Sequence, residues 1–334
     1  MAMYILIVIG SIILIYIIWM ASLKGSYHIR RSRIMKQPID NVWPMVYDLR
    51  NWVKWSPWLS AEPTAKINYK GREEGEGAMY DWQGELVGSG EMEHLKIKEN
   101  KRIDQEVRFT KPWKSKSGVY WEFEKKEEGV EVTWGMKGKM PFLFRFMTRQ
   151  MEPMIGMDYE RGLKMMNELL EKGKVSSHIE IEGVVDSQEI SYIGQRTSSK
   201  KDEISSSMQK IIGDLSTYAK EKQLEPVSVI SVYHTFDFPK DDIDYTSGIE
   251  VPEDTPLDKE EFHKGKIPAT KAVKVIFKGD YENLPNGWSA AFSYQRYKKL
   301  KMNKKIAPFE IYRNNPGEVP NPDDWITEIY IPVK

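Results

Sequence analysis

The sequence predicts an α+β protein in three parts: an N-terminal transmembrane helix, an antiparallel sheet with a long C-terminal helix, and a duplicated β-α-β-β domain with a pseudo-twofold cleft. Residues 1–21 contain no charged side chain, histidine or proline. Short alternating segments within residues 27–137 precede one long segment with helical spacing, and the order strand, helix, strand, strand then occurs twice. We therefore assign residues 1–22 to an anchor, 25–173 to a first domain and 177–334 to a second.

The segment Met1–Ala21 is long enough to cross a membrane, because an α-helix needs about 20 apolar residues to span the hydrocarbon core. A cleaved signal peptide is the alternative, but no Lys or Arg precedes the apolar run and the residues around Ala21 make a poor cleavage site. The following segment is basic, so the positive-inside rule predicts a single-pass membrane protein with its C-terminal domains in the cytoplasm. Its basic residues are Lys24, Arg30, Arg31, Arg33 and Lys36.

The first domain is predicted to be a series of strands followed by one helix. Residues 27–34 alternate as a strand, and Asp40 is placed to cap a short helix over 41–49. Five further alternating segments, bounded by glycine or charged turns, predict an antiparallel sheet over 78–84, 88–99, 101–109, 118–125 and 129–137. A helix is predicted over 144–172, with an apolar stripe rich in methionine and with Pro153 as a kink or break.

The segment QPIDNVWPMVYDLRNWVKWSPW, residues 37–58, resembles the opening of the START-like superfamily, in its polyketide cyclase/dehydrase and lipid-transport (SRPBCC) branch. There a Pro-x-x-x-Val-Trp helix start is followed by Asp-x-x-x-Trp-x-x-Trp-x-Pro. The resemblance implies a helix-grip fold with a deep apolar cavity for a lipid-like molecule. The side chains expected in this cavity are Trp52, Trp55, Met151 and Met154. The alternative for each is a place in the hydrophobic core, which is the commoner role of such residues.

The second domain repeats one pattern of elements. Residues 178–198 have strand character, a helix is predicted over 202–222, and two strands follow. The order then recurs with a strand over 269–281, a helix over 284–301 and two final strands. The paired strands are predicted over 227–236 and 244–251 in the first repeat, and over 308–313 and 325–333 in the second. This duplication predicts a pseudo-twofold domain with a cleft between its halves.

The segments APFEIYRNNP (307–316), DWITEIYIPV (324–333) and DYTSGIEVP (244–252) resemble the gyrase-inhibitor-like domain, which also serves as the effector-binding domain of AraC- and MerR-type regulators. The resemblance implies a cleft in which an acidic residue among aromatic rings binds an organic cation. The residues that it places there are Glu310 as the acid, Tyr312 and Trp288 beside it, Glu328 as second choice and Glu250 as third. The alternative for Glu310 is an edge-strand carboxylate paired with a surface lysine.

Several function classes lack their motifs. The chain has no Gly-rich phosphate loop, no His-x-x-x-His pair, no Gly-x-Ser-x-Gly elbow and no cysteine, so we expect neither a metal nor a cofactor. Its 49 basic and 49 acidic residues, and the lack of a helix-turn-helix segment, argue against nucleic acid as a partner. The leading hypothesis is a non-enzymatic, membrane-anchored protein that binds a lipid or an organic cation. The alternatives are a hydrolase that uses Glu310 as general base, and a protein-interaction scaffold.

Overall fold

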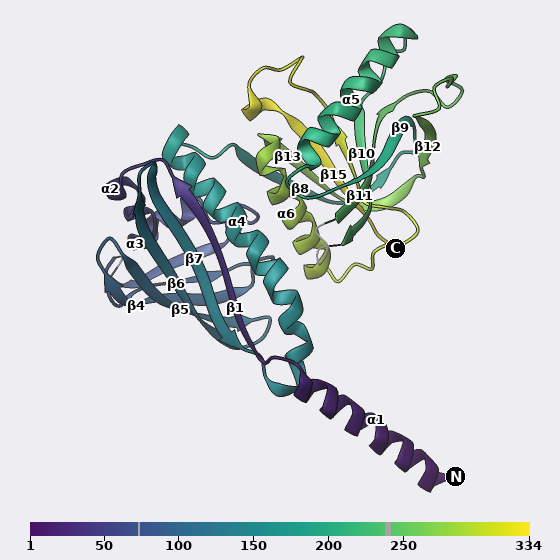
Figure 1. The fold of residues 1–334 in the computed structure, drawn as a ribbon. Coiled ribbons are helices and arrows are strands. Elements are labelled where there is room, and N and C mark those ends of the chain that lie inside the picture. The colour runs from purple at the N-terminus through teal and green to yellow at the C-terminus, as the bar shows by residue number, and fades with distance from the viewer. Residues whose placement is uncertain (73, 238–241) are drawn as a thin grey trace. The chain divides into compact units, whose positions relative to one another are not determined.

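The computed structural model describes residues 1–72, 74–237 and 242–334 (Figure 1). The chain divides into two compact units. The first contains Met1–Leu59 and Pro63–Val175, and the second contains Ser60–Glu62 and Ser176–Lys334.

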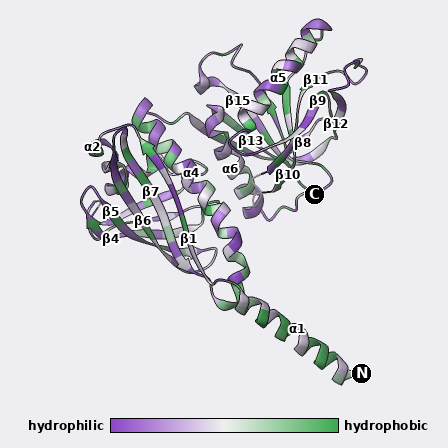
Figure 2. Cartoon of the chain, viewed as in Figure 1, coloured by the Kyte–Doolittle hydropathy of each residue, from purple (hydrophilic) through white to green (hydrophobic). Residues whose placement is uncertain are grey.

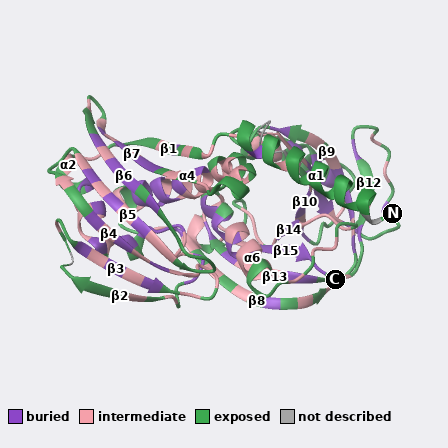
Figure 3. Ribbon diagram, turned by 90° about the horizontal axis from the view of Figure 1, so that it is seen from below, coloured by how far each residue is buried: buried purple, intermediate pink, exposed green. Residues whose placement is uncertain are grey.

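Helix α1 (Ala2–Ser22) is, among the described residues, the one helix long and apolar enough to cross a membrane. Its apolar side chains are almost all exposed (Figures 2 and 3), so they do not form the core of a soluble domain. Near the end of the helix this changes, because Met20 is completely buried. The helix ends where Leu23 adopts an extended conformation, and strand β1 begins at Ser26.

In the described part of the first unit, seven strands form one antiparallel sheet in the order β1-β7-β6-β5-β4-β3-β2. The sheet contains the six strands that the alternating patterns predict and an additional edge strand, β2. The bounds are β1 Ser26–Met35, β2 Lys66–Gly71, β3 Ala78–Gln83, β4 Ser89–Lys98, β5 Arg102–Lys111, β6 Ser115–Lys126 and β7 Gly129–Lys139. Between β1 and β2 lie short helices α2 (Ile39–Val42), α3 (Pro44–Tyr47) and the 3-10 helix η1 (Leu49–Lys54).

The predicted long helix is divided in two. A 3-10 helix, η2 (Phe142–Met147), precedes α4 (Thr148–Lys172), which runs through Pro153 and ends at the left-handed Gly173, a common helix terminus. Met154, which was expected to line an apolar cavity, is instead 56% exposed on the surface of α4. At 100° per residue, Met154 lies about 140° around the helix from the buried Tyr159. Met151 is half-buried.

The interior between the sheet and α4 is filled with aromatic rings. Trp134 stacks on Trp121 on one side (4.4 Å between centroids) and on Tyr159 of α4 on the other (3.9 Å). Trp52 and Trp55 are fully buried and meet both of these tryptophans edge-on. Their indole nitrogens donate to the backbone carbonyls of Val46 and Met45 respectively. Trp52 and Trp55 are therefore parts of the core of this unit.

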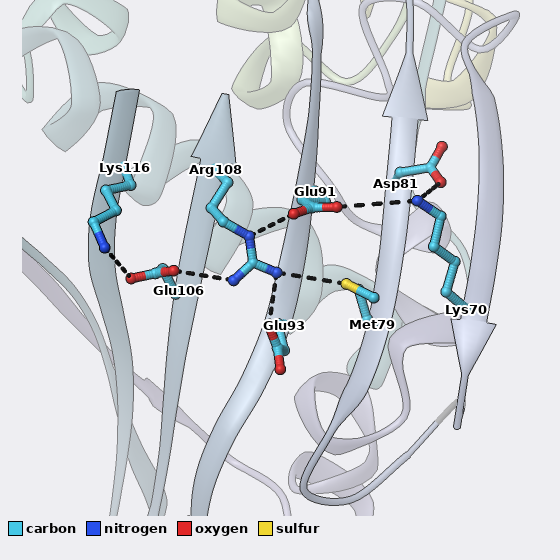
Figure 4. A network of polar contacts seen from close by, with 8 residues as sticks. All are labelled: Lys70, Met79, Asp81, Glu91, Glu93, Glu106, Arg108 and Lys116. Carbon is cyan, nitrogen blue, oxygen red and sulfur yellow. Dashed lines mark hydrogen bonds and ion pairs between the residues drawn. The ribbon is translucent and has the colours of Figure 1, made fainter. Parts of the chain in front are cut away.

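The opposite face of this sheet carries an ion-pair network centred on Arg108 of β5 (Figure 4). Its guanidinium contacts the carboxylates of Glu91, Glu93 (2.6 Å) and Glu106 (3.0 Å). Lys70 extends the network, because it contacts both Glu91 (4.0 Å) and Asp81 (2.9 Å). All these groups are partly exposed, so each pair contributes ~1 kcal/mol or less. The first unit thus keeps these charges outside and aromatic rings inside.

In the described part of the second unit, eight strands form one antiparallel sheet in the order β12-β9-β11-β10-β14-β15-β13-β8. The six inner strands show the duplication, because β9, β11 and β10 mirror β13, β15 and β14 about the β10–β14 pair. The bounds are β8 Ser177–Ser187, β9 Ile190–Ser199, β10 Val229–Asp237, β11 Asp242–Glu250, β12 His263–Ile267, β13 Thr270–Gly279, β14 Phe309–Tyr312 and β15 Ile326–Pro332. Edge strand β12 was not predicted.

Helices α5 (Ile204–Glu221) and α6 (Leu284–Tyr297) pack on the same face of this sheet. The apolar side chains of α5 lie over β9, β10 and β11, and those of α6 lie over β13 and β15. Trp288 of α6 packs against both clusters and so joins the two halves of the core. The helix that was predicted to reach residue 301 ends at Tyr297, shortly before Lys299 takes up a positive φ of 54°.

Candidate functional site

One carboxylate lies at the centre of the second sheet. Glu310 is on β14, next to the axis of the duplication, and its cross-strand partners are Ser231 of β10 and Ile329 of β15. Its side chain points to the face that α5 and α6 cover, and it is completely buried. The alternative of an edge-strand carboxylate is therefore wrong, because β14 has a neighbour on each side.

Three hydrogen-bond donors converge on Glu310. The hydroxyls of Tyr312 and Tyr233 donate to Oε2 at 2.6 Å and 2.8 Å, and the indole N–H of Trp288 donates to Oε1. Within residues 1–72, 74–237 and 242–334 no basic side chain forms an ion pair with this carboxylate. The site therefore supplies dipoles to a buried acid but no countercharge.

The fold explains how each donor reaches the carboxylate. Tyr312 lies two residues after Glu310 on the same strand, so both side chains point to one face. Tyr233 comes from the neighbouring strand β10, two residues beyond Ser231. Trp288 is brought down by the close approach of α6 to the sheet, which Gly287 permits. A Cβ atom at position 287 would lie 2.6 Å from Cδ1 of Ile329.

A second layer of aromatic rings surrounds the donors. Phe236 stacks on Tyr233 with 5.3 Å between centroids, and Phe292 stacks on Trp288 with 5.8 Å. Tyr281 meets Tyr312 edge-on at 5.4 Å. The side chains of Phe236, Phe292 and Tyr281 are all half-buried, unlike Glu310. A layer of half-buried aromatic rings thus surrounds the fully buried carboxylate and its donors.

Burial raises the pKa of Glu310 above its ordinary value of 4.5, although hydrogen bonds from Tyr312, Trp288 and Tyr233 act in the opposite direction. The pKa values of Tyr233 and Tyr312 are raised as well, through burial and through the nearby Glu310 charge. Both hydroxyls therefore stay protonated and remain donors. The carboxylate is therefore the member of this group whose charge changes with pH while both tyrosines remain protonated.

The structure does not bring the second predicted acid into this group. Glu328 is paired with Ile311 in the β14–β15 register and so points to the opposite face of the sheet from Glu310. There it contacts Arg313 (2.6 Å), Lys274 (3.1 Å) and the hydroxyl of Tyr330 (2.7 Å). Burial opposes its ionisation, but these hydrogen bonds outweigh burial and lower its pKa. Glu328 is a compensated carboxylate and Glu310 is not.

The third candidate, Glu250 at the end of β11, accepts a hydrogen bond from Ser228 and takes no part in the Glu310 group. The second-layer rings of Phe292 and Tyr281 were not among the predicted site residues, and neither were Tyr233 and its stacking partner Phe236 on β10. The signal that could have found the two residues of β10 is the duplication itself, because β10 and β14 hold equivalent places in the two repeats and become neighbours. In the described residues, no three metal-ligating side chains lie together.

Comparison with known protein families gives a match for the C-terminal part of the chain. Residues 184–334 match the family model of the GyrI-like small molecule binding domain. No curated protein matches the chain.

Solved structures that are similar to part of the chain include protein MLL2253 from Mesorhizobium loti, with 14% identity over 45% of this chain and 100% of that chain and a TM-score of 0.35. EcmrR, in a complex with DNA, has 19% identity over 57% of this chain and 68% of that chain, with a TM-score of 0.40. SAV2435, bound to tetraphenylphosphonium, has 14% identity over 46% of this chain and 94% of that chain, with a TM-score of 0.36. From the family match, residues 184–334 are a GyrI-like small molecule binding domain.

Proposed function

We propose that this protein is a membrane-anchored small-molecule binding protein whose C-terminal domain binds an organic cation at Glu310. The observation that carries the proposal is a completely buried carboxylate that receives three hydrogen bonds and no countercharge. An ionised group in a protein interior is strongly disfavoured unless an opposite charge compensates it. A bound cation supplies the charge that the described residues do not.

The surroundings of Glu310 favour an organic cation over a metal ion. A metal would need several oxygen or nitrogen acceptors, but Tyr233, Tyr312 and Trp288 all present donors and ring faces. A quaternary ammonium or phosphonium ion needs no acceptors, and each aromatic face adds about 0.5–2 kcal/mol of cation–π attraction. The ligand class is therefore an apolar cation whose charge approaches Glu310 and whose body packs on the rings.

The test is a titration of the full-length protein in non-ionic detergent with tetraphenylphosphonium and with tetraphenylborate, which has a similar shape and the opposite charge. Saturable binding of the cation, at least about 30-fold tighter than binding of the anion, is expected from a buried charge pair. Equal affinity for the two ions, or no saturable binding across a panel of organic cations, would overturn the proposal.

For residues 25–173 we propose a START-like helix-grip module that takes an apolar or lipid-type molecule. The antiparallel sheet with α4 packed against it supports the fold, and the half-buried Met151 is the remaining candidate on the helix. The filled aromatic interior instead favours the scaffold alternative for this half. Native mass spectrometry of the extracted protein decides between them. A co-purified lipid that survives the Glu310→Gln substitution supports the module, and its absence supports the scaffold.

A hydrolase is the second candidate function for the C-terminal domain, and the raised pKa of Glu310 is the observation that favours it. A general base works best when its pKa lies near the working pH, and Glu310 could activate a water against a strained ring. Turnover of such substrates that is lost in Glu310→Gln, while the variant remains folded, would support this role. Turnover that survives the substitution would exclude it.

A further inference from the structure

The 3-10 helix η2 is joined to the end of the apolar helix α1. The hydroxyl of Tyr16 donates to the backbone carbonyl of Leu143 at 2.7 Å. The ring of Trp19 stacks on Phe146, with 6.4 Å between centroids and 18° between planes. One guanidinium nitrogen of Arg145 donates to the carbonyl of Met20 at 3.4 Å. The contacts reach two turns back into α1, not only its last residue.

These contacts fix the depth of η2 relative to α1. Tyr16 lies six residues before the helix end at Ser22, which corresponds to about 9 Å along the axis. The headgroup region on each side of a bilayer is only ~5–8 Å thick, since it separates a ~30 Å hydrocarbon core from a total of ~40–45 Å. If α1 crosses the bilayer, the carbonyl of Leu143 lies at the boundary between headgroups and acyl chains. The η2 segment cannot then stand clear of the lipid.

The side chains of η2 suit such a place. Leu143 is 54% exposed and Phe144 is 50% exposed, and Phe142 and Phe146 are exposed to a smaller extent. Large apolar side chains gathered in one short segment are unusual on a surface that faces only water. Residues 137–149, which contain η2, also carry four basic side chains and no acidic one. Apolar rings with surrounding cations are the composition of an interfacial segment on an anionic membrane.

Arg145 holds η2 in this orientation. Its guanidinium lies over the ring of Phe142, 4.8 Å from the centroid, and packs against the backbone of Gly25. A Cβ atom at position 25 would lie 2.8 Å from Nε of Arg145, so this packing depends on a glycine between α1 and β1. The joint between the helix and the sheet is therefore tightly packed.

A second exposed aromatic side chain lies at the same end of the sheet. Strand β1 begins at Ser26 opposite Lys139, the last residue of β7. Strand β6 begins at Ser115 at this end as well, since Gly118 pairs with Lys137. The β5–β6 turn, residues 111–116, therefore lies at the end from which α1 leaves, and it carries three lysines. At its tip Trp113 is 65% exposed.

We infer that η2 and the β5–β6 turn form a membrane-contact surface that inserts Leu143, Phe144 and Trp113 into the interfacial layer of an anionic bilayer. The inference rests on the proposed anchoring by α1. The lysines of residues 111–116 and 137–149 are attracted to the anionic lipid headgroups, as polybasic segments beside a membrane are. The first unit is then held to the membrane by a surface and not only by a tether.

The cysteine-free chain allows this to be tested with single labels. Leu143→Cys and Trp113→Cys, each in the full-length protein, receive an environment-sensitive fluorophore. The protein is placed in vesicles of phosphatidylcholine with ~30% phosphatidylserine. Leu95→Cys is the matched control, because Leu95 is 50% exposed on β4 but lies about 20 Å along the strand from the end at Ser89. Ile9→Cys in the middle of α1 is the depth marker.

We expect shallow spin-labelled lipids to quench positions 143 and 113 at least 3-fold more than position 95, and deep ones to quench position 9. Quenching at 143 no stronger than at 95, together with a deeply placed position 9, would overturn the inference and leave the anchor intact. An unquenched position 113 would remove the β5–β6 turn from the surface. An unquenched position 9 would overturn the anchoring itself, and the inference with it.

Discussion

Replacing Glu310 by glutamine tests the central claim about the C-terminal domain. The side chain keeps its size, and an amide oxygen can still accept from Tyr312 and Tyr233, whose hydroxyls lie 2.6 Å and 2.8 Å from Oε2. The substitution removes the charge and also the acceptor of the Trp288 N–H, because the amide nitrogen takes the place of Oε1. At about 4 Å and an effective dielectric constant of about 20, a cation and a carboxylate attract each other by roughly 4 kcal/mol. Removing one partner of a buried charge pair costs about 2–5 kcal/mol.

With about 1.36 kcal/mol for each factor of ten, the lower bound of that range corresponds to a roughly 30-fold rise in Kd. The assay is isothermal titration of full-length wild type and variant with tetraphenylphosphonium at pH 8. Glu328→Gln is the control, because it removes a carboxylate from the opposite face of the same sheet and should leave this Kd unchanged. A Kd that changes less than threefold in Glu310→Gln would refute the reasoning, as would an equal loss in both variants.

Three other predictions follow from the same contacts. Because the folded pKa of Glu310 is raised and that of Glu328 is lowered, the wild type should lose stability through Glu310 as pH rises above 4.5, and through Glu328 as pH falls below it. When melting temperature is measured against pH, Glu310→Gln should lack the decrease above pH 4.5, and Glu328→Gln should lack the decrease below it. The same pH dependence in the wild type and both variants would contradict the assignment. Tyr233→Phe should raise the pKa of Glu310 further and move the pH midpoint of cation binding upwards, which pH-dependent titration measures. Gly287→Ala should destabilise the domain by about 1–3 kcal/mol in denaturant melts, because its Cβ would meet Ile329; wild-type stability would show that α6 can shift.

Strands with a buried face could be predicted from the sequence, and strands without one could not. The six predicted strands of the first unit show apolar alternation because one side of each packs on the core. Strand β2 has almost no buried residue, and β12 buries only Ile267, so neither has a hydrophobic period to detect. Edge strands such as these are specified by the neighbour that they pair with, which a single segment of sequence does not reveal.

The part of the site that neighbours in the sequence form could be predicted, and the part that distant segments bring together could not. Glu310 and Tyr312 share a face because they are two residues apart on one strand, which the sequence alone implies. Trp288 was placed by resemblance, and its hydrogen bond to Glu310 depends on the approach of α6 that Gly287 permits. Tyr233 required knowledge that β10 pairs with β14 across 77 residues of chain. Glu328 carries a similar motif, but its register places it on the other face.

The difference between Glu310 and Glu328 bears on why a cation is the expected ligand. Both carboxylates are buried in one sheet and both accept hydrogen bonds from tyrosine, but only Glu328 has basic partners, Arg313 and Lys274. The same fold can therefore compensate a buried acid. It does so at Glu328, which is next to the cross-strand partner of Glu310 on β15 but points to the opposite face of the sheet.

Leaving Glu310 without a countercharge lowers the stability of the ligand-free domain at neutral pH, since its raised pKa favours the protonated form. A cation that binds the folded state alone restores this stability, by about 2.7 kcal/mol at a concentration of 100 times Kd. Ligand occupancy and domain stability are thus coupled through one side chain. An organic cation should therefore raise the melting temperature of the domain, and it should do so only while residue 310 is acidic.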